Sequence, residues 1–272
     1  MLNLIQVVRG RPLSRVRRLR PVRPSKQVEV WYRGQLATIV DSCKAAVKNE
    51  VLPNLKAAQN EYAYTQDKFA TTFAQNLKKV RTALNDALEI GATTLSTQFV
   101  GRQRKESEKR FGDSVKQVLG VDLKSAVAKS PRMEMVVEQA IQANVSLIKS
   151  IPSQFFDRVE QSVLQNTMKG WSYSDLANEI LNIGGITERR AELIARDQTG
   201  SVNAAITEDL QTAAGIEQYE WSTSNDERVR DEHADFDGEI FDWDKPPPDG
   251  HPGQAINCRC VAIPILTPQR AE

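Results

Sequence analysis

Both histidines of the chain, and two of its three cysteines, lie within one short segment near the C-terminus. They are His233, His251, Cys258 and Cys260, with the spacing His-x17-His-x6-Cys-x-Cys. Imidazole nitrogen and thiolate sulfur are donors that zinc prefers, and four of them complete the tetrahedral coordination of a structural zinc ion. The sequence therefore predicts a zinc site here, which would stabilise a loop-rich region too small for a good core.

The same residues also allow an arrangement without metal. Cys258 and Cys260 are two positions apart in a predicted strand, so both could face one buried side and pack as small hydrophobic groups. His233 could then bond an acidic neighbour. The third cysteine, Cys43, is isolated in a predicted helix, where packing is the simplest role. Three cysteines at these positions do not predict a disulfide framework.

Acidic residues surround His233 in the sequence. Residues 217–250 hold 12 acidic and 3 basic side chains. Such a segment is usually a solvated turn, but carboxylates beside a histidine can also act as general acid and base. We therefore keep a second function class open, a toxin-like nuclease or transferase domain that uses His233 or His251. The sequence shows no P-loop, no G-x-S-x-G and no H-E-x-x-H motif.

The N-terminal 28 residues are strongly basic. They carry seven arginines and one lysine without an acidic residue, whereas the other 244 residues sum to a charge of −7. An arginine-rich segment can bind DNA, because each phosphate contact releases counterions. A solvated tail and an organelle transit peptide are the alternatives, although three prolines interrupt the amphipathic helix of a transit peptide. The predicted DNA-binding residues are Arg9, Arg11, Arg15, Arg17, Arg18, Arg20 and Arg23.

Proline is scarce between residues 29 and 216, where hydrophobic residues recur at the three- and four-residue spacing of helices. We expect one helix to end before Pro152 and another to follow it. We expect Gly184-Gly185 to separate two further helices, and Gly215 to cap the last of them. No run of 18 apolar residues predicts a membrane-spanning helix.

After Gly215 the residues become typical of strands and turns. Strands are predicted at residues 218–224, 239–241 and 260–265, with Pro264 directing the last one to a sheet edge. The proline-rich segment 246–253 predicts a loop. The predicted fold class is therefore mainly α, with an extended helical body and a compact, loop-rich, small α+β domain at the C-terminus.

Residues 144–264 resemble the Mu F-like head-morphogenesis proteins of tailed phages, also called minor head or minor capsid proteins. The resemblance is carried by stretches that include GWSYSDLANEI, RRAELIARDQTGSVNAA, AGIEQYEWSTSNDERVRDEHADFDGEIF and GHPGQAINCRCVAIP, in this order. The positions that match the family motif are Trp221, Asp226, Arg228, Arg230, His233, Gly238, Asn257, Cys258 and Cys260.

We accordingly divide the chain into four parts. A basic flexible arm (1–28) precedes a helical body without a recognised relative (29–143). A Mu F-like domain follows (144–266), with helices up to residue 215 and a small α+β part over 216–266. Residues 267–272 form a tail.

The resemblance implies a minor component of the phage head that acts in head morphogenesis, and in DNA packaging or ejection. It implies the portal protein as partner, with packaged DNA and the scaffold or major capsid protein as further partners, and no membrane during assembly. The implied location is the head interior or the portal vertex of the virion, and the host cytoplasm during assembly. A structural protein is expected rather than an enzyme, with zinc as the one cofactor considered.

Overall fold

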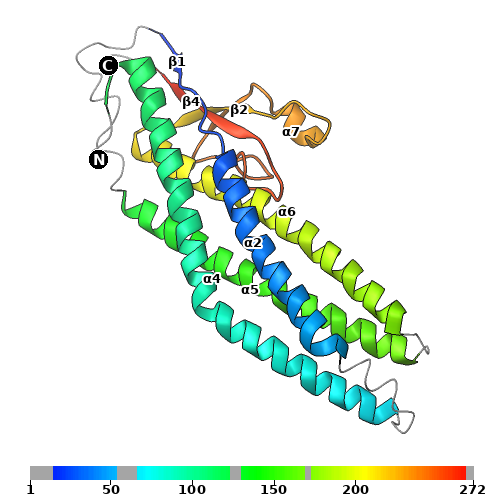
Figure 1. Cartoon of the computed structure of the whole chain (residues 1–272). Coiled ribbons are helices and arrows are strands. Elements are labelled where there is room, and N and C mark those ends of the chain that lie inside the picture. Colours follow the sequence, from blue (N-terminus) through cyan, green and yellow to red (C-terminus); the bar gives the residue numbers. More distant parts are fainter. Residues whose placement is uncertain (1–14, 54–65, 123–129, 169–172, 268–272) are drawn as a thin grey trace. The chain divides into compact units, whose positions relative to one another are not determined.

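The computed structural model describes residues 15–53, 66–122, 130–168 and 173–267 (Figure 1). The described chain is mainly helical with one small antiparallel sheet, which confirms the predicted fold class. No described helix is long and apolar enough to cross a membrane. The elements are β1 (Arg17–Arg18), α2 (Lys26–Ala46), the π-helix η2 (Val47–Val51), α4 (Gln66–Leu119), α5 (Pro131–Met168), α6 (Tyr173–Ala213), β2 (Gln218–Ser222), α7 (Asp231–Asp235), β3 (Ile240–Asp242) and β4 (Val261–Leu266).

The chain forms two compact units. Unit 1 comprises the described residues within 1–29, 98–141 and 196–272, and unit 2 comprises those within 30–97 and 142–195. Helices α2, α4, α5 and α6 each contribute residues to both units. The units are therefore assembled from segments distant in sequence, whereas the predicted domains follow one another along the chain.

Unit 2 has a core of apolar residues from α2, η2, α4, α5 and α6. These residues recur at helical spacing, so each helix presents one buried face. Tyr32 of α2 adds a buried polar contact, because its hydroxyl donates to Oδ1 of Asn144 at 3.0 Å. The core residues are Cys43, Val47, Val51, Phe73, Leu77, Val80, Phe155, Phe156, Val159, Val163, Leu176, Ile180 and Ile183.

Helix α5 continues through Pro152, contrary to the predicted break. A proline inside a helix costs about 3 kcal/mol because it removes one hydrogen bond and crowds the preceding turn. Ile148 and Ile151 before it, and Phe155 and Phe156 after it, are all fully buried. Burying one such side chain contributes about 1.5–3 kcal/mol, so packing on both sides of Pro152 outweighs the local penalty.

Helix α6 likewise continues through Gly184-Gly185, where the sequence predicts a separation. Each glycine costs about 1 kcal/mol relative to alanine in a helix. The side chain of Lys44 passes Gly184 so closely that a Cβ there would lie 3.3 Å from its Cδ. Nζ of Lys44 then reaches Oε1 of Glu188 at 2.5 Å. Gly184 is thus explained by the approach of a neighbouring side chain rather than by a helix end.

The end of α6 confirms the predicted cap. Gly215 has φ 78°, the left-handed conformation that glycine adopts without strain. Its N–H donates to the carbonyl of Thr212 at 3.0 Å, and the N–H of Ile216 donates to the carbonyl of Gln211 at 2.9 Å. This pair of bonds is a Schellman motif, which directs the chain from α6 into β2.

The sheet of unit 1 has the order β1-β4-β2-β3, with every neighbouring pair antiparallel. The three strands predicted after Gly215 are present, but β4 is not at an edge as Pro264 suggested. The carbonyl of Pro264 accepts from the N–H of Leu19 at 3.0 Å. Because the N–H and C=O of one strand residue face the same neighbour, the donor that proline lacks is missing toward the short strand β1. The pairing with β2 is therefore undisturbed.

Residues 15–25 are packed into unit 1, which differs from the predicted flexible arm. Arg17 and Arg18 pair with Leu266 and Ile265, so β1 lies beside β4 (Figure 1). Leu19 and Val22 are buried. The apolar positions between the arginines thus anchor the segment, while the basic side chains remain on the surface.

Candidate metal centre

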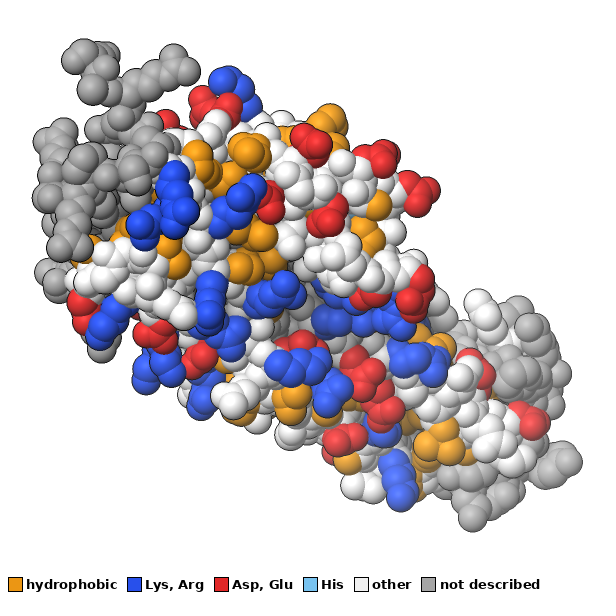
Figure 2. Space-filling view, turned by 90° about the horizontal axis from the view of Figure 1, so that it is seen from above, with side chains coloured by type: hydrophobic (Ala, Val, Ile, Leu, Met, Phe, Trp, Pro, Cys, Tyr) orange, Lys and Arg blue, Asp and Glu red, His pale blue; other side chains and the backbone are white. Residues whose placement is uncertain are grey.

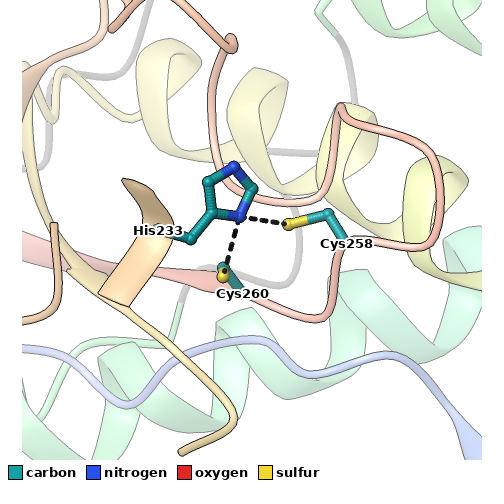
Figure 3. A group of neighbouring side chains, drawn as sticks. All are labelled: His233, Cys258 and Cys260. Atoms are coloured by element: carbon teal, nitrogen blue, oxygen red, sulfur yellow. Dashed lines mark hydrogen bonds between the residues drawn. The ribbon is translucent and has the colours of Figure 1, made fainter. Parts of the chain in front are cut away.

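Three of the four predicted zinc ligands come together in unit 1. Nδ1 of His233 lies 3.6 Å from Sγ of Cys258 and 3.6 Å from Sγ of Cys260. Figure 3 shows both sulfur atoms facing the same ring nitrogen. The three donor atoms lie within 4.8 Å of one another. His233 comes from α7, Cys258 from the loop before β4, and Cys260 from the position directly before β4.

Helix α7 holds His233 at its centre. Backbone N–H of Ala234 donates to the carbonyl of Arg230 at 2.9 Å, which closes the first turn. The imidazole is buried and packs edge-on against Trp221, with ring centroids 5.0 Å apart. Phe236 packs against the same indole at 5.2 Å. Aromatic packing therefore fixes the orientation of the His233 ring.

The loop before β4 positions Cys258 through two residues in the left-handed conformation. Gly253 has φ 87°, and a Cβ there would lie 2.7 Å from Cβ of Ala204 in α6. This close approach lets the N–H of Gly253 donate to Sγ of Cys258 at 3.3 Å. Asn257 has φ 58°, and its N–H donates to Oδ1 of Asp197 at 2.6 Å. The loop is thus attached to α6 at two points, Gly253 and Asn257, that both precede Cys258.

The second nitrogen of His233 has a carboxylate partner. Nε2 lies 2.7 Å from Oδ2 of Asp249. Nη1 of Arg230 approaches the same oxygen at 3.6 Å, and Nη2 of Arg230 donates to the carbonyl of Ile256 at 2.9 Å. Since a carboxylate only accepts, Nε2 carries the hydrogen and the lone pair at Nδ1 faces the two sulfurs. Metal-binding histidines commonly have such a carboxylate partner.

The separations of the donor atoms also suit a shared ion. A neutral imidazole has one acceptor lone pair, so two thiols cannot both donate well to Nδ1. A tetrahedral zinc ion with its usual bond lengths separates nitrogen from sulfur by about 3.6 Å. Both Nδ1–Sγ distances have this value. Both nitrogen–sulfur separations therefore fit one shared metal ion.

The two thiols differ in acidity. The pKa of Cys258 is lowered, first because the thiol of Cys260 donates a hydrogen bond to it and also because the N–H of Gly253 does. The pKa of Cys260 is raised by the same bond and by burial. Cys258 is therefore the first of the two to become a thiolate, the form that binds metal.

His251 does not join the group. Its Nδ1 lies 2.9 Å from the hydroxyl of Tyr219, and its ring packs on Trp243 with centroids 4.7 Å apart. Burial lowers the pKa of His251. The predicted four-ligand site thus becomes a group of three, because the loop directs His251 into the aromatic core instead.

Cys43 is a buried member of the unit 2 core, in agreement with the packing role expected for it. Burial raises the pKa of its thiol to about 12. Such a thiol stays protonated at neutral pH and is a poor metal ligand.

The remaining motif residues support the same region. Asp226 forms a two-pronged ion pair with Arg259, between the two cysteines, and the pair lowers the pKa of Asp226. The N–H of Arg228 donates to Oδ1 of Asp226 at 3.0 Å, while the side chain of Arg228 is exposed. Gly238 has φ 85° and bonds the carbonyl of Trp221 at 2.8 Å. The motif therefore surrounds and shapes the His/Cys/Cys group.

Sequence reasoning missed Asp249. It belongs to the proline-rich segment that predicts only a loop, and eight residues separate it from Cys258. Of the acidic residues near His233 in the sequence, the described structure bonds only Asp249 to the ring. No signal in the sequence distinguishes it from the exposed Asp231, Glu232 and Asp235.

The structure describes five of the seven predicted DNA-binding arginines. Arg9 and Arg11 lie outside the described residues. Arg18 pairs with Glu220 at 2.6 Å, and Nη1 of Arg17 donates to the carbonyl of Val118 at 2.9 Å. Exposed arginine side chains also occur at positions 15, 20 and 23. The face shown in Figure 2 carries Lys and Arg side chains with Asp and Glu among them.

Comparisons with known proteins show that this region is similar to one family. Residues 157–263 match the model of a family described as Phage Mu protein F like protein. A protein of Haemophilus influenzae, described as uncharacterized, is 36% identical over 269 residues. That match covers 98% of this chain and 59% of the relative, so the chain spans about three fifths of its length. No solved structure matches the chain. The predicted resemblance to the Mu F-like phage head proteins is therefore confirmed, over the segment that contains His233, Cys258 and Cys260.

Proposed function

We propose that this chain is a minor component of a tailed-phage head and acts in head morphogenesis. The observation that carries the proposal is the match of residues 157–263 to the Mu F-like family. The matched segment contains every residue of the His/Cys/Cys group and the motif around it. The uncharacterized relative supports no particular role.

The finer proposal is that the protein is located at the portal vertex or in the head interior of the virion, and in the host cytoplasm during assembly. Its partner there is the portal protein, with the scaffold or major capsid protein and packaged DNA as further partners. At this position the protein would act in DNA packaging or ejection. The proposal includes no enzymatic activity.

The test uses the phage or prophage that encodes the chain. An in-frame deletion of the gene should sharply reduce infectious particles, and a plasmid copy should restore them. Mass spectrometry of purified virions should detect the chain at far lower copy number than the major capsid protein. In a parallel experiment, the tagged chain and the portal protein are co-expressed. The two proteins should be isolated as a complex at 0.15 M salt, an ionic strength that already weakens surface ion pairs by screening. Normal virions without the chain would contradict the proposal.

We also propose that exposed arginines near the N-terminus bind DNA phosphates. Arg15, Arg20 and Arg23 are exposed, whereas Arg17 and Arg18 already have partners. Replacing these three arginines by glutamine should weaken binding to duplex DNA and reduce its salt dependence, because fewer counterions are released. The matched control replaces Lys78, Lys79 and Lys105, which are surface residues outside this segment, by glutamine. An equal effect of both variants would argue against a dedicated DNA site.

We propose zinc as the ion that His233, Cys258 and Cys260 hold, with a structural role. The support is the donor set, the 3.6 Å separations and the carboxylate on Nε2. Purified protein should contain about one zinc per chain. Excess chelator should lower the melting temperature of the wild type but not that of the Cys258→Ala variant, which has already lost a ligand. Protein that melts identically with and without chelator would contradict this proposal.

A further inference from the structure

We infer that the ion at His233, Cys258 and Cys260 has three protein ligands and a fourth position occupied by an exchangeable small ligand, such as water. The inference rests on the proposed zinc site and extends it. It replaces the closed four-ligand site that the sequence predicts. It follows from the number and placement of the metal-binding side chains that the chain possesses.

No further imidazole or thiolate is available to the ion. The whole chain has two histidines and three cysteines. His251 bonds Tyr219 through Nδ1 and is packed among aromatic rings. Cys43 is fully buried among the apolar residues of the unit 2 core. The fourth donor must therefore be an oxygen ligand or an exogenous molecule.

The described carboxylates do not complete the site either. Among the described residues, no Asp or Glu oxygen joins the three donors within 4.8 Å of one another. Asp249 contacts the ring of His233, but it does so at Nε2, the ring nitrogen that faces away from the sulfurs. Oδ1 of Asp237 accepts from the N–H and the hydroxyl of Thr223 at 2.7 and 2.9 Å. These carboxylates are engaged elsewhere, which leaves the fourth position to a small molecule.

The surroundings give such a ligand a route to the ion. His233 and Cys260 are buried, but Cys258 is only partly buried. Its neighbours Asn257 and Arg259 are exposed, so a small ligand would approach the buried donor atoms from the side of Cys258. Zinc with three protein ligands and a water is the arrangement found where the metal exchanges ligands, whereas closed sites have four protein ligands. Water, small anions and low-molecular-weight thiols are the ligands that suit this position.

The experiment replaces zinc by Co2+ in the full chain and follows visible absorption. Two thiolates should produce strong sulfur-to-cobalt charge-transfer bands, and a four-coordinate ion should produce intense visible bands. Adding azide or imidazole should shift the visible bands in a saturable way. The His251→Gln variant should bind one Co2+ with an unchanged spectrum and respond to azide like the wild type.

Three outcomes are distinguishable. Saturable shifts in both proteins support the inference. A spectrum that azide and imidazole leave unchanged, or that His251→Gln alters, overturns it while leaving the zinc proposal intact. Failure of the wild type to bind Co2+ overturns the zinc proposal and the inference together. None of these results depends on whether the chain is found in virions, so the head-morphogenesis proposal stands or falls separately.

Discussion

Oδ2 of Asp249 lies 2.7 Å from Nε2 of His233, on the side of the ring opposite the two cysteines. The bond fixes which nitrogen carries the hydrogen, so the lone pair at Nδ1 faces Cys258 and Cys260. Arg230, which precedes α7, approaches Asp249 at 3.6 Å. The loop that holds Asp249, the short helix α7 and the segment directly before β4 are therefore connected through one imidazole ring.

Asp249→Ala should weaken metal binding by about 10- to 100-fold, the usual effect of removing the partner of a metal-bound histidine. Asp249→Asn should have a smaller effect, because the amide oxygen still accepts from Nε2. Competition with a chromophoric chelator measures both affinities. The matched control is Asp235→Asn, which changes an exposed carboxylate on α7. Equal affinity for Asp249→Ala and wild type would show that Asp249 does not orient His233.

His251→Gln should leave the metal content unchanged but lower the stability of the protein. The substitution removes the bond to Tyr219 and the ring packing on Trp243. Loss of a buried hydrogen bond costs about 1–3 kcal/mol. Denaturant unfolding and metal analysis of the same preparation check the two parts. A loss of metal in this variant would restore His251 as a ligand.

The protonation of His251 should contribute to the pH dependence of the free energy of unfolding. Burial lowers the pKa of His251 in the folded protein below its unfolded value of about 6.5. The unfolded chain therefore takes up the proton first, and the folded state loses stability as pH falls below about 6.5. Unfolding free energies of wild type and His251→Gln at pH 8 and pH 5.5 measure the effect. The variant should lose less stability than wild type between these values, since both share every other titrating group.

Gly253→Ala should destabilise the protein more than Gly238→Ala. Both glycines have positive φ, 87° and 85°, so both variants incur backbone strain of about 1 kcal/mol or more. A Cβ at Gly253 would also lie 2.7 Å from that of Ala204, whereas a Cβ at Gly238 meets nothing within 4 Å. The difference between their urea midpoints therefore isolates the contact of the loop with α6. Equal midpoints would mean that the loop can move away from α6 at little cost.

Asp209→Asn should stabilise the protein at neutral pH. Burial raises the pKa of Asp209, so the folded state disfavours the ionised carboxylate and stability falls as pH rises through the folded pKa. The amide oxygen of the variant would still accept from Ser130, as Oδ1 of Asp209 does at 3.1 Å. Each kcal/mol gained should raise the melting temperature by about 2–4 °C. The neighbouring Glu208→Gln should not stabilise, because Glu208 pairs with Arg132. A gain that persists unchanged at pH 4 would argue against titration of Asp209.

Local sequence patterns predicted those features whose causes are local. The helical spacing, the capping role of Gly215 and the strands after it depend on neighbours a few residues away, and the structure has all of them. The family resemblance rests on motif residues that gather around His233, and it was equally visible in the sequence. The helix breaks predicted at Pro152 and at Gly184-Gly185 were wrong, because they were inferred from local helix propensity without tertiary packing. Pro152 and Gly184 lower helix propensity, but buried residues on both sides of each keep the helices continuous.

The sequence by itself determined the supply of donors, since only two histidines and three cysteines are available. Tertiary structure alone decided which of them meet. His233 reaches the cysteines because α7 packs on Trp221 and the loop before β4 is attached to α6, while His251 is directed to Tyr219. Tertiary structure also placed Asp249 next to His233 and placed the segment 15–25 beside the sheet. The physical reason is that convergence depends on how distant segments pack, whereas residue spacing records only the distance along the chain.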